Sequence, residues 1–202
     1  MFGSNTLFPM PTLETPRLIL RRITMRDAED VFAYSRDPEV ARHVLWNAQK
    51  RLSEAKEFCR WQRRHYRADE PSSWGIIPKE TGHLAGTIGY MDYNPDNASV
   101  ELGYSLARDF WNRGFMTEAL SQVIEYTFSN MDIHRIEAQH ETDNPSSGRV
   151  MEKCGMHREG VLRGRLYNKG KHVDVCLYAI LRTDPRPVQK RRPYLSQERS
   201  AL

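Results

Sequence analysis

A carboxylate in an apolar run and a glycine ahead of a helix are the features of the sequence best suited to chemistry. Glu101 lies between Val100 and Leu102, where burial would raise its pKa from the usual value of about 4.3 and make it a general base near neutral pH. Gly114 precedes a helical pattern, and a helix N-terminus with a closely approachable backbone suits a phosphate group. The alternatives are an exposed carboxylate or an ammonium ligand for Glu101, and an ordinary turn for Gly114.

The elements that position these residues follow from the spacing of apolar side chains. Alternating or short apolar runs predict strands at 17–24, 73–78, 83–92, 98–107, 134–140, 158–167 and 171–182. Apolar residues three and four apart predict a helix that starts after Thr24 and ends near Ser35, and helices at 54–68, 115–131 and 146–154. This order predicts a mixed α/β fold in which the helix at 115–131 crosses between two strands.

Polar residues and a glycine predict where the helices begin and end. Thr24 and Asp27 have the spacing of a capping box, and Ser53 is the candidate N-cap of the helix at 54–68. Pro38 predicts an interruption after the first helix. Gly155 suits the left-handed position that follows a helix C-terminus.

Length and composition exclude several classes of protein. The chain has 202 residues, 39% of them hydrophobic and 28% charged, and it lacks a run of apolar residues long enough to span a membrane. Its three cysteines show no disulfide or zinc spacing, and the N-terminal segment lacks the pattern of a secretory signal. We therefore expect a cytoplasmic protein with no membrane partner; monomer and homodimer both stay open.

Positive charge concentrates at the C-terminus. Residues 183–202 carry five basic and two acidic side chains, a net charge of +3, whereas the preceding 182 residues carry 25 basic and 24 acidic ones. Three prolines and the absence of apolar periodicity predict a single domain over 1–183 and a basic, disordered tail over 184–202. The tail is interpreted as a solvated terminus, with an arm for RNA or an acidic partner as the alternative. Nucleic-acid binding is expected nowhere else.

Metal and thiol chemistry are not predicted. Cys154 and His157 lack two further ligands at zinc spacing, and the pair lacks a third group that would orient it for nucleophilic catalysis. His134 and His140 flank one strand and are interpreted as structural. Aromatic residues, the pairs Trp46/Trp61 and Tyr90/Tyr93, either line an acceptor groove or pack in the core.

Four segments carry a family pattern in order and at family spacing: Thr15–Arg21, Glu101–Tyr104, Trp111–Ala119, and Asn144–Met156 with Glu159 and Gly160. Over about residues 13–182 they resemble the GNAT superfamily of N-acetyltransferases, and within it the Rim-type branch, which acetylates protein amino termini and other amines. Trp111 and Met116 depart from the general superfamily pattern. Because backbone N–H groups bind the pyrophosphate, this departure affects affinity more than the existence of the site.

The resemblance implies a three-layer fold and a co-substrate. The fold is a central, twisted, mostly antiparallel sheet of about seven strands, splayed between strands 98–107 and 134–140, with helices on both faces. The co-substrate is acetyl-CoA, and no metal is implied. Its pyrophosphate is expected on Asn112, Arg113, Gly114, Phe115, Met116 and Thr117, and Leu106, Asn144 and Ser147 complete the expected binding residues.

The implied reaction is direct attack of a neutral amine on a thioester. Glu101 is the candidate base, and a backbone N–H near Leu106, freed by a β-bulge, is the candidate donor to the oxyanion. Ser147 is expected beside the sulfur and Asn144 at the pantetheine amide, with Tyr167 as an alternative acid. The competing interpretations are a helix-capping role for Ser147 and a turn-forming role for Asn144.

The acceptor is the least constrained part of this hypothesis. An α-amino group has a pKa near 8 and a lysine near 10.4, so a modest base favours a protein or peptide amino terminus. A small amine, such as a polyamine, amino sugar or amino acid, is the alternative within the class. A CoA-binding or RNA-associated module without catalytic activity is the alternative outside it.

Overall fold

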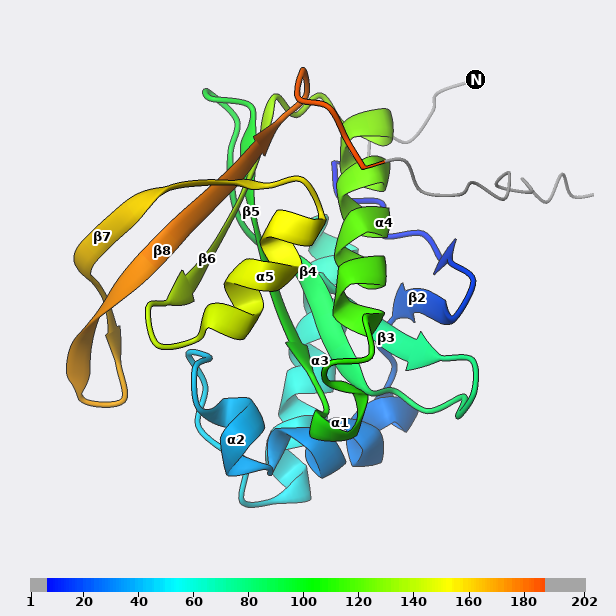
Figure 1. The fold of residues 1–202 in the computed structure, drawn as a ribbon. Helices are drawn as coiled ribbons and strands as arrows, with labels where there is room; N and C mark the ends of the chain where they lie inside the picture. Colours follow the sequence, from blue (N-terminus) through cyan, green and yellow to red (C-terminus); the bar gives the residue numbers. More distant parts are fainter. Residues whose placement is uncertain (1–6, 188–202) are drawn as a thin grey trace, which may run out of the picture.

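A single sheet runs through the part of the chain described by the computed structural model, residues 7–187, with strand order β1-β2-β3-β4-β5-β6-β8-β7 (Figure 1). All neighbouring strands are antiparallel except the pair β5 and β6, which is parallel. The strand bounds are β1 Leu13–Glu14, β2 Leu18–Arg22, β3 Ser73–Pro78, β4 Gly86–Asn94, β5 Ser99–Leu106, β6 Arg135–Glu141, β7 His157–Asn168 and β8 Lys171–Leu181.

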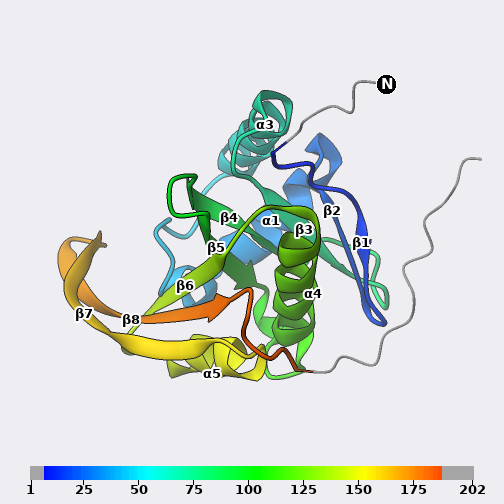
Figure 2. The same cartoon turned by 90° about the horizontal axis from the view of Figure 1, so that it is seen from above.

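Helices cover both faces of this sheet, which confirms the predicted three-layer fold. The α-helices are α1 Ala28–Ser35, α2 Pro38–Ala41, α3 Leu52–Ala68, α4 Phe115–Asn130 and α5 Pro145–Lys153; the 3₁₀ turns are η1 Met25–Asp27 and η2 Arg108–Phe110. In Figure 2, α1 and α3 lie on one side of the sheet and α4 and α5 on the other. None of the helices within residues 7–187 has both the length and the apolar composition that crossing a bilayer requires.

Local sequence signals explain most of the element boundaries and fail at three. The capping box of Thr24 and Asp27 forms as predicted. The N-cap of α3 is Arg51 rather than Ser53, so that prediction was wrong by two residues. Pro38 does interrupt α1, but it also starts the unpredicted helix α2, because proline suits a first helical turn and Asp37 caps it. The short strand β1 was missed as well, which makes eight strands rather than seven.

The sheet divides between its two central strands. β5 pairs with β6 only over Ser99–Glu101, opposite Arg135–Glu137. Beyond Glu101, β5 continues along β4 and β6 continues along β8, so the two strands separate. Helix α4 makes the crossover that a parallel pair needs, and it packs four consecutive inward positions, Ala119, Leu120, Val123 and Ile124, into the core. The predicted splay is therefore confirmed.

The described chain continues past the predicted end of the domain. Asp184 accepts a hydrogen bond from the Leu181 N–H at 2.9 Å, and Arg186 lies 3.0 Å from Glu125 of α4. Asp184 and Arg186, which follow the predicted boundary at 183, thus contact the domain. The prediction of a disordered tail otherwise falls on residues 188–202, which lie outside the described residues.

Candidate functional site

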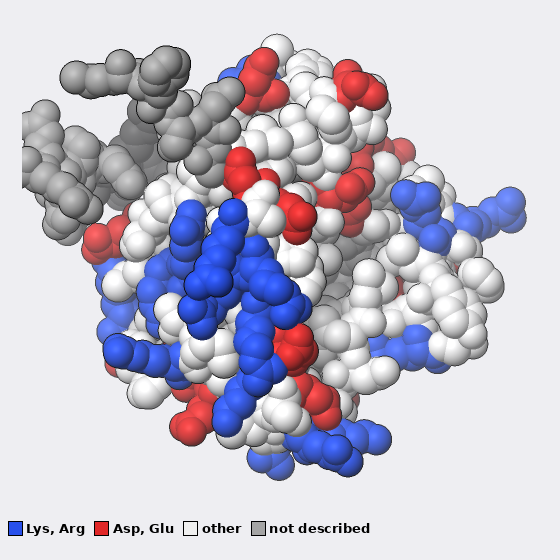
Figure 3. All heavy atoms as spheres, turned by 180° about the vertical axis from the view of Figure 1, so that it is seen from behind, with Lys and Arg blue, Asp and Glu red and all other residues white. Residues whose placement is uncertain are grey.

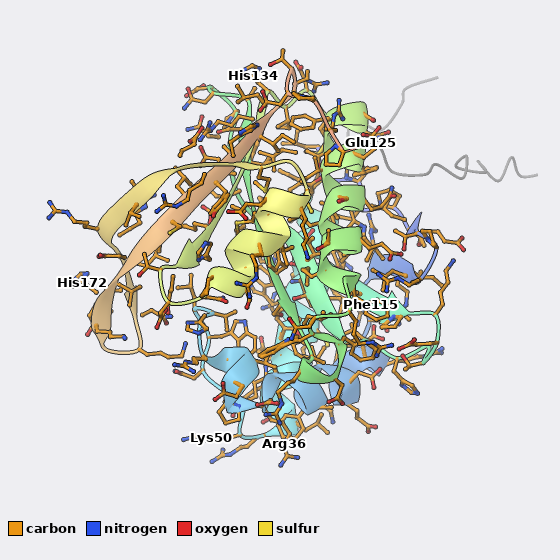
Figure 4. All side chains as sticks on the ribbon, in the orientation of Figure 1. Arg36, Lys50, Phe115, Glu125, His134 and His172 are labelled. Carbon is orange, nitrogen blue, oxygen red and sulfur yellow. The ribbon has the colours of Figure 1, made fainter. Side chains whose placement is uncertain are left out.

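A cleft of about 1110 Å³ opens where β5 and β6 separate. The N-termini of α4 and α5 form one end, and Phe115 marks the start of α4 in Figure 4. The segment from α2 to α3 and the beginning of β3 form the other end, which we call the acceptor end. Glu101, Leu106, Gly114, Asn144 and Ser147 all line this one cleft, so the structure brings together the main residues that the sequence singled out.

Glu101 lies at the point where the two strands part. Its side chain is half-buried, and its Oε1 accepts a hydrogen bond from Gln139 Nε2 of β6 at 2.8 Å. Burial is the main reason that the pKa of Glu101 lies above its ordinary value. The hydrogen bond from Gln139 opposes this shift, whereas the neighbouring carboxylates of Glu137 and Asp92 add to it. The environment therefore moves this carboxylate toward the pKa range of a base that works near neutrality.

Leu106 lines the cleft as expected, but the β-bulge that was predicted to free its N–H group is absent there. The β-bulge expected there lies instead in β4, between Tyr90 and Asp92, while Leu106 pairs regularly with Gly86. The Ala107 N–H donates to Ala85 O at 2.7 Å. Because N–H directions alternate along a strand, the Leu106 N–H points away from β4, to the side from which β6 has diverged. The splay of the sheet, not a bulge, turns this donor toward the cleft.

The turn before α4 has the backbone geometry that glycine permits. Gly114 is the N-cap with φ 78°, and Asn112 is also left-handed at φ 58°. No side chain caps this helix end, and the Phe115 and Met116 side chains are buried in the core. The backbone N–H groups of the first turn are thus left for an anion, while Thr117 lines the cleft.

The N-terminal segment braces this turn, a role that the sequence did not reveal. Arg17 donates from Nη1 to Arg113 O at 2.8 Å, and its Nε lies 2.6 Å from Glu118 Oε2. Thr15 Oγ1 donates to the other carboxylate oxygen of Glu118 at 2.6 Å. Arg113 itself pairs with Glu80 at 2.8 Å. The contacts of Thr15 and Arg17 join segments about a hundred residues apart, so sequence spacing gave no signal of them.

Ser147 meets a partner that sequence reasoning missed. Its Oγ lies 2.8 Å from the Tyr104 hydroxyl of β5, and burial raises the pKa of Tyr104, which therefore stays protonated. Asn144, not Ser147, occupies the N-cap position of α5, and its side chain makes no capping hydrogen bond. The signals available for Tyr104 were its place in the family segment Glu101–Tyr104 and its position two residues after Leu102 in the predicted strand.

Tyr167 is placed outside the cleft, which removes it as an alternative acid. Its side chain is 66% exposed, and its ring packs edge to face against His172 at 5.1 Å. Successive side chains of a strand point to opposite sides. Asn168 is buried and Leu166 lines the cleft, so Tyr167 between them faces outward.

The acceptor end is acidic and is closed by contacts between distant segments. His43 Nδ1 lies 3.0 Å from Glu141 and 3.4 Å from Asp143, and Asn168 donates to the other oxygen of Glu141 at 2.5 Å. The ligand atoms of His43, Glu141 and Asp143 lie within 4.8 Å of one another, a cluster that the sequence did not predict. Hydrogen bonds within the protein engage both oxygens of Glu141. Of the aromatic candidates, Trp46, Trp61 and Tyr90 line the cleft, whereas Tyr93 packs against Phe8.

Comparisons with known proteins agree on one family. A model described as an acetyltransferase (GNAT) domain matches residues 17–157. The uncharacterized N-acetyltransferase YoaA of Bacillus subtilis (strain 168) is 36% identical over 172 residues, which cover 85% of this chain and 97% of that protein. The [ribosomal protein uS5]-alanine N-acetyltransferase of Escherichia coli (strain K12) is 27% identical over 202 residues, covering 93% and 99%. The crystal structure of a GNAT-family acetyltransferase from Bacillus anthracis superposes with a TM-score of 0.76 at 26% identity, covering 85% and 98%.

Proposed function

Since this chain belongs to the GNAT acetyltransferase family, we propose that it transfers the acetyl group of acetyl-CoA to the amino terminus of a protein or peptide. Family membership makes the chain an acetyl-CoA-dependent N-acetyltransferase, and its relatives place it with the Rim-type branch that the motifs indicated. The observation that carries the proposal is the half-buried Glu101 at the parting of β5 and β6, in a cleft that also holds an uncapped helix N-terminus.

The residues at the α4 end fit acetyl-CoA. Its pyrophosphate suits the backbone N–H groups of residues 112–117, because Gly114 carries no side chain at the turn and no side chain makes a capping hydrogen bond to this helix end. Leu106 and Asn144 also line the cleft, and we assign the Leu106 N–H and the Asn144 side chain to the pantetheine arm. Arg149 and Lys153 of α5 also line this end and add positive charge for phosphate groups.

We assign a residue of the cleft to each step of the transfer. Acetyl-CoA supplies an activated thioester, whose carbon forms a bond to the amine nitrogen as the bond to sulfur breaks. Glu101 accepts the proton that the amine loses. The Leu106 N–H stabilises the negative charge that develops on the thioester oxygen. The Ser147 and Tyr104 hydroxyls, which lie 2.8 Å apart, are assigned to donate a hydrogen bond to the departing thiolate, which needs little help because the pKa of a thiol is about 8.5.

Two features support an amino terminus as the acceptor. Glu101 is a modest base, and an α-amino group with a pKa near 8 loses its proton more readily than a lysine. Carboxylates of Glu70, Glu101 and Asp143 line the cleft and attract an ammonium group. The E. coli relative is named for acetylation of an alanine of a ribosomal protein, which agrees with an acceptor of this class.

Replacing Gln139 with leucine tests how Glu101 is tuned. Gln139 lowers the pKa of Glu101 by donating a hydrogen bond, so its loss raises that pKa. Because the base acts as a carboxylate, we expect the acidic limb of the pH profile of kcat/KM to move to higher pH. Glu137→Gln removes a carboxylate that raises the pKa of Glu101, so the limb moves to lower pH. If the acidic limb of the pH profile does not move in either variant, the group that titrates in kcat/KM is not Glu101.

The acceptor is tested by measuring CoA thiol release from acetyl-CoA with a panel of amines. We expect release with peptides that begin with Ser, Ala or Met, and none with the same peptides when the amino terminus is blocked and an internal lysine is present. Polyamines, amino sugars and free amino acids form the comparison group. CoA release with this group alone would show that the acceptor is a small amine. If no amine of the panel causes CoA release although acetyl-CoA still binds, the proposed function is contradicted.

A further inference from the structure

Helix α3 presents a row of cations on the side turned away from the cleft. Phe58 and Trp61 line the acceptor end, and Ala55 and Cys59 are buried in the core. Exposed basic side chains occupy most of the remaining circumference, and Figure 3 shows basic side chains gathered into a connected area on this side of the molecule. We call this set the basic face of α3: Lys56, Arg60, Arg63, Arg64 and Arg67.

Most of this charge is not compensated by the protein. Within residues 7–187, Glu57 is the one carboxylate that pairs with the basic face, at 2.5 Å from Arg60 and 3.4 Å from Arg64. The other three cations make no ion pair or side-chain hydrogen bond to the described residues. Cations four residues apart on a helix repel each other, and this face contains three such pairs. An anionic partner would relieve that repulsion.

The chemistry of the face favours a phosphate backbone over a protein. Protein interfaces depend on a central apolar or aromatic anchor, and no large exposed hydrophobic side chain of the described residues lies on this face. Four of its five cations are arginines, whose planar guanidinium binds phosphate through two hydrogen bonds.

An exposed aromatic ring borders the basic face, since Trp61, which directly follows Arg60, is 40% exposed. Bases stack on such rings only where a strand is unpaired, so cations beside an aromatic ring favour a single strand over a duplex. A single strand can follow the exposed side, and RNA presents such strands as loops and ends. We propose that the basic face of α3 binds single-stranded RNA through its phosphates. This proposal does not depend on the identity of the acetyl acceptor.

The test is fluorescence anisotropy of the full-length chain with a labelled 20-nucleotide single-stranded RNA of mixed sequence. If about four phosphates are contacted, raising the salt from about 50 to about 200 mM weakens binding by about 50-fold. The triple variant Lys56→Gln, Arg63→Gln, Arg67→Gln removes only the uncompensated cations and keeps good helix formers. We expect it to bind at least about tenfold more weakly with a shallower salt dependence, while peptide acetylation is unchanged.

A second triple variant controls for net charge. Arg36→Gln, Arg163→Gln, Lys171→Gln removes three exposed cations from other surfaces and is expected to bind RNA as the unaltered chain does. If both triple variants lose the same amount of RNA affinity, net charge alone explains the loss, and the proposal is overturned. If the α3 variant binds RNA as tightly as the unaltered chain, the RNA site lies elsewhere, for example at the basic residues of 188–202, and the proposal is overturned. Tighter binding of a duplex DNA of equal length, or of an acidic peptide alone, would also overturn it.

Discussion

Glu101→Gln is expected to lower kcat at pH 7 by about two orders of magnitude while the affinity for acetyl-CoA stays nearly unchanged, because general bases typically contribute factors of about 10² to 10⁴. Glutamine keeps the size of the side chain but cannot accept the proton of the amine. Steady-state kinetics with a peptide acceptor, together with calorimetry of acetyl-CoA binding, measure the two quantities separately.

The same experiment separates a base from an ammonium ligand. If Glu101 only holds the protonated amine, the substitution raises the KM of the acceptor and leaves kcat in place. As a control, Glu29→Gln makes the same change at an exposed carboxylate of α1 that does not line the cleft, and we expect no effect on kcat. An unchanged kcat in Glu101→Gln would remove this residue from the role of base.

Gly114→Val is expected to weaken acetyl-CoA binding by more than tenfold. At φ 78°, a residue with a side chain costs roughly 1–2 kcal/mol, and a β-branched one is strained further. A Cβ would also lie 3.4 Å from Arg17 Nη2, a group of the brace that holds the turn. The turn can relieve this strain only by changing its backbone, which moves the N–H groups away from the pyrophosphate. Isothermal titration calorimetry measures the loss directly.

Gly170→Val provides a matched control for backbone strain. Gly170 has φ 84°, and a Cβ there would have open space around it at the tip of the β7–β8 hairpin. Both variants are expected to lower the melting temperature, but only Gly114→Val should lose affinity. Equal affinities in Gly114→Val and the unaltered chain would contradict the assignment of the turn to the pyrophosphate.

Local patterns predicted the elements of the fold well, and long-range contacts account for the errors. The apolar period of α4, the capping box at Thr24 and the hairpin at 168–170 are each determined by neighbours in sequence. Strand β1 is two residues long, too short for any period to be detected, and it forms because Leu13 and Glu14 pair with β2.

The candidate site shows the same division. Glu101 and Gly114, which both line the cleft, could be proposed from the sequence because one lies in a predicted strand and the other precedes a predicted helix. Tyr104 was missed because its contact with Ser147 joins residues 43 apart in the chain. Tyr167 was chosen from family placement, and the direction of its side chain was decided by how β7 packs against β8. The role of Leu106 as a donor stays a prediction, but the predicted cause was wrong: its N–H is freed by the separation of β5 from β6, and Leu106 itself pairs regularly with Gly86.

The separation of β5 and β6 also bears on self-association. Two strands that part within a sheet create a pair of internal edges, and unpaired edges are templates on which another copy of a chain can add a strand. Here the edges lie at the bottom of a cleft walled by α4, α5 and the segment 43–46. A slender, flexible molecule can reach the backbone groups, whereas the sheet of a second copy is held off by these walls. The gap between β5 and β6 can therefore stay open for a substrate without promoting aggregation through the unpaired strand edges.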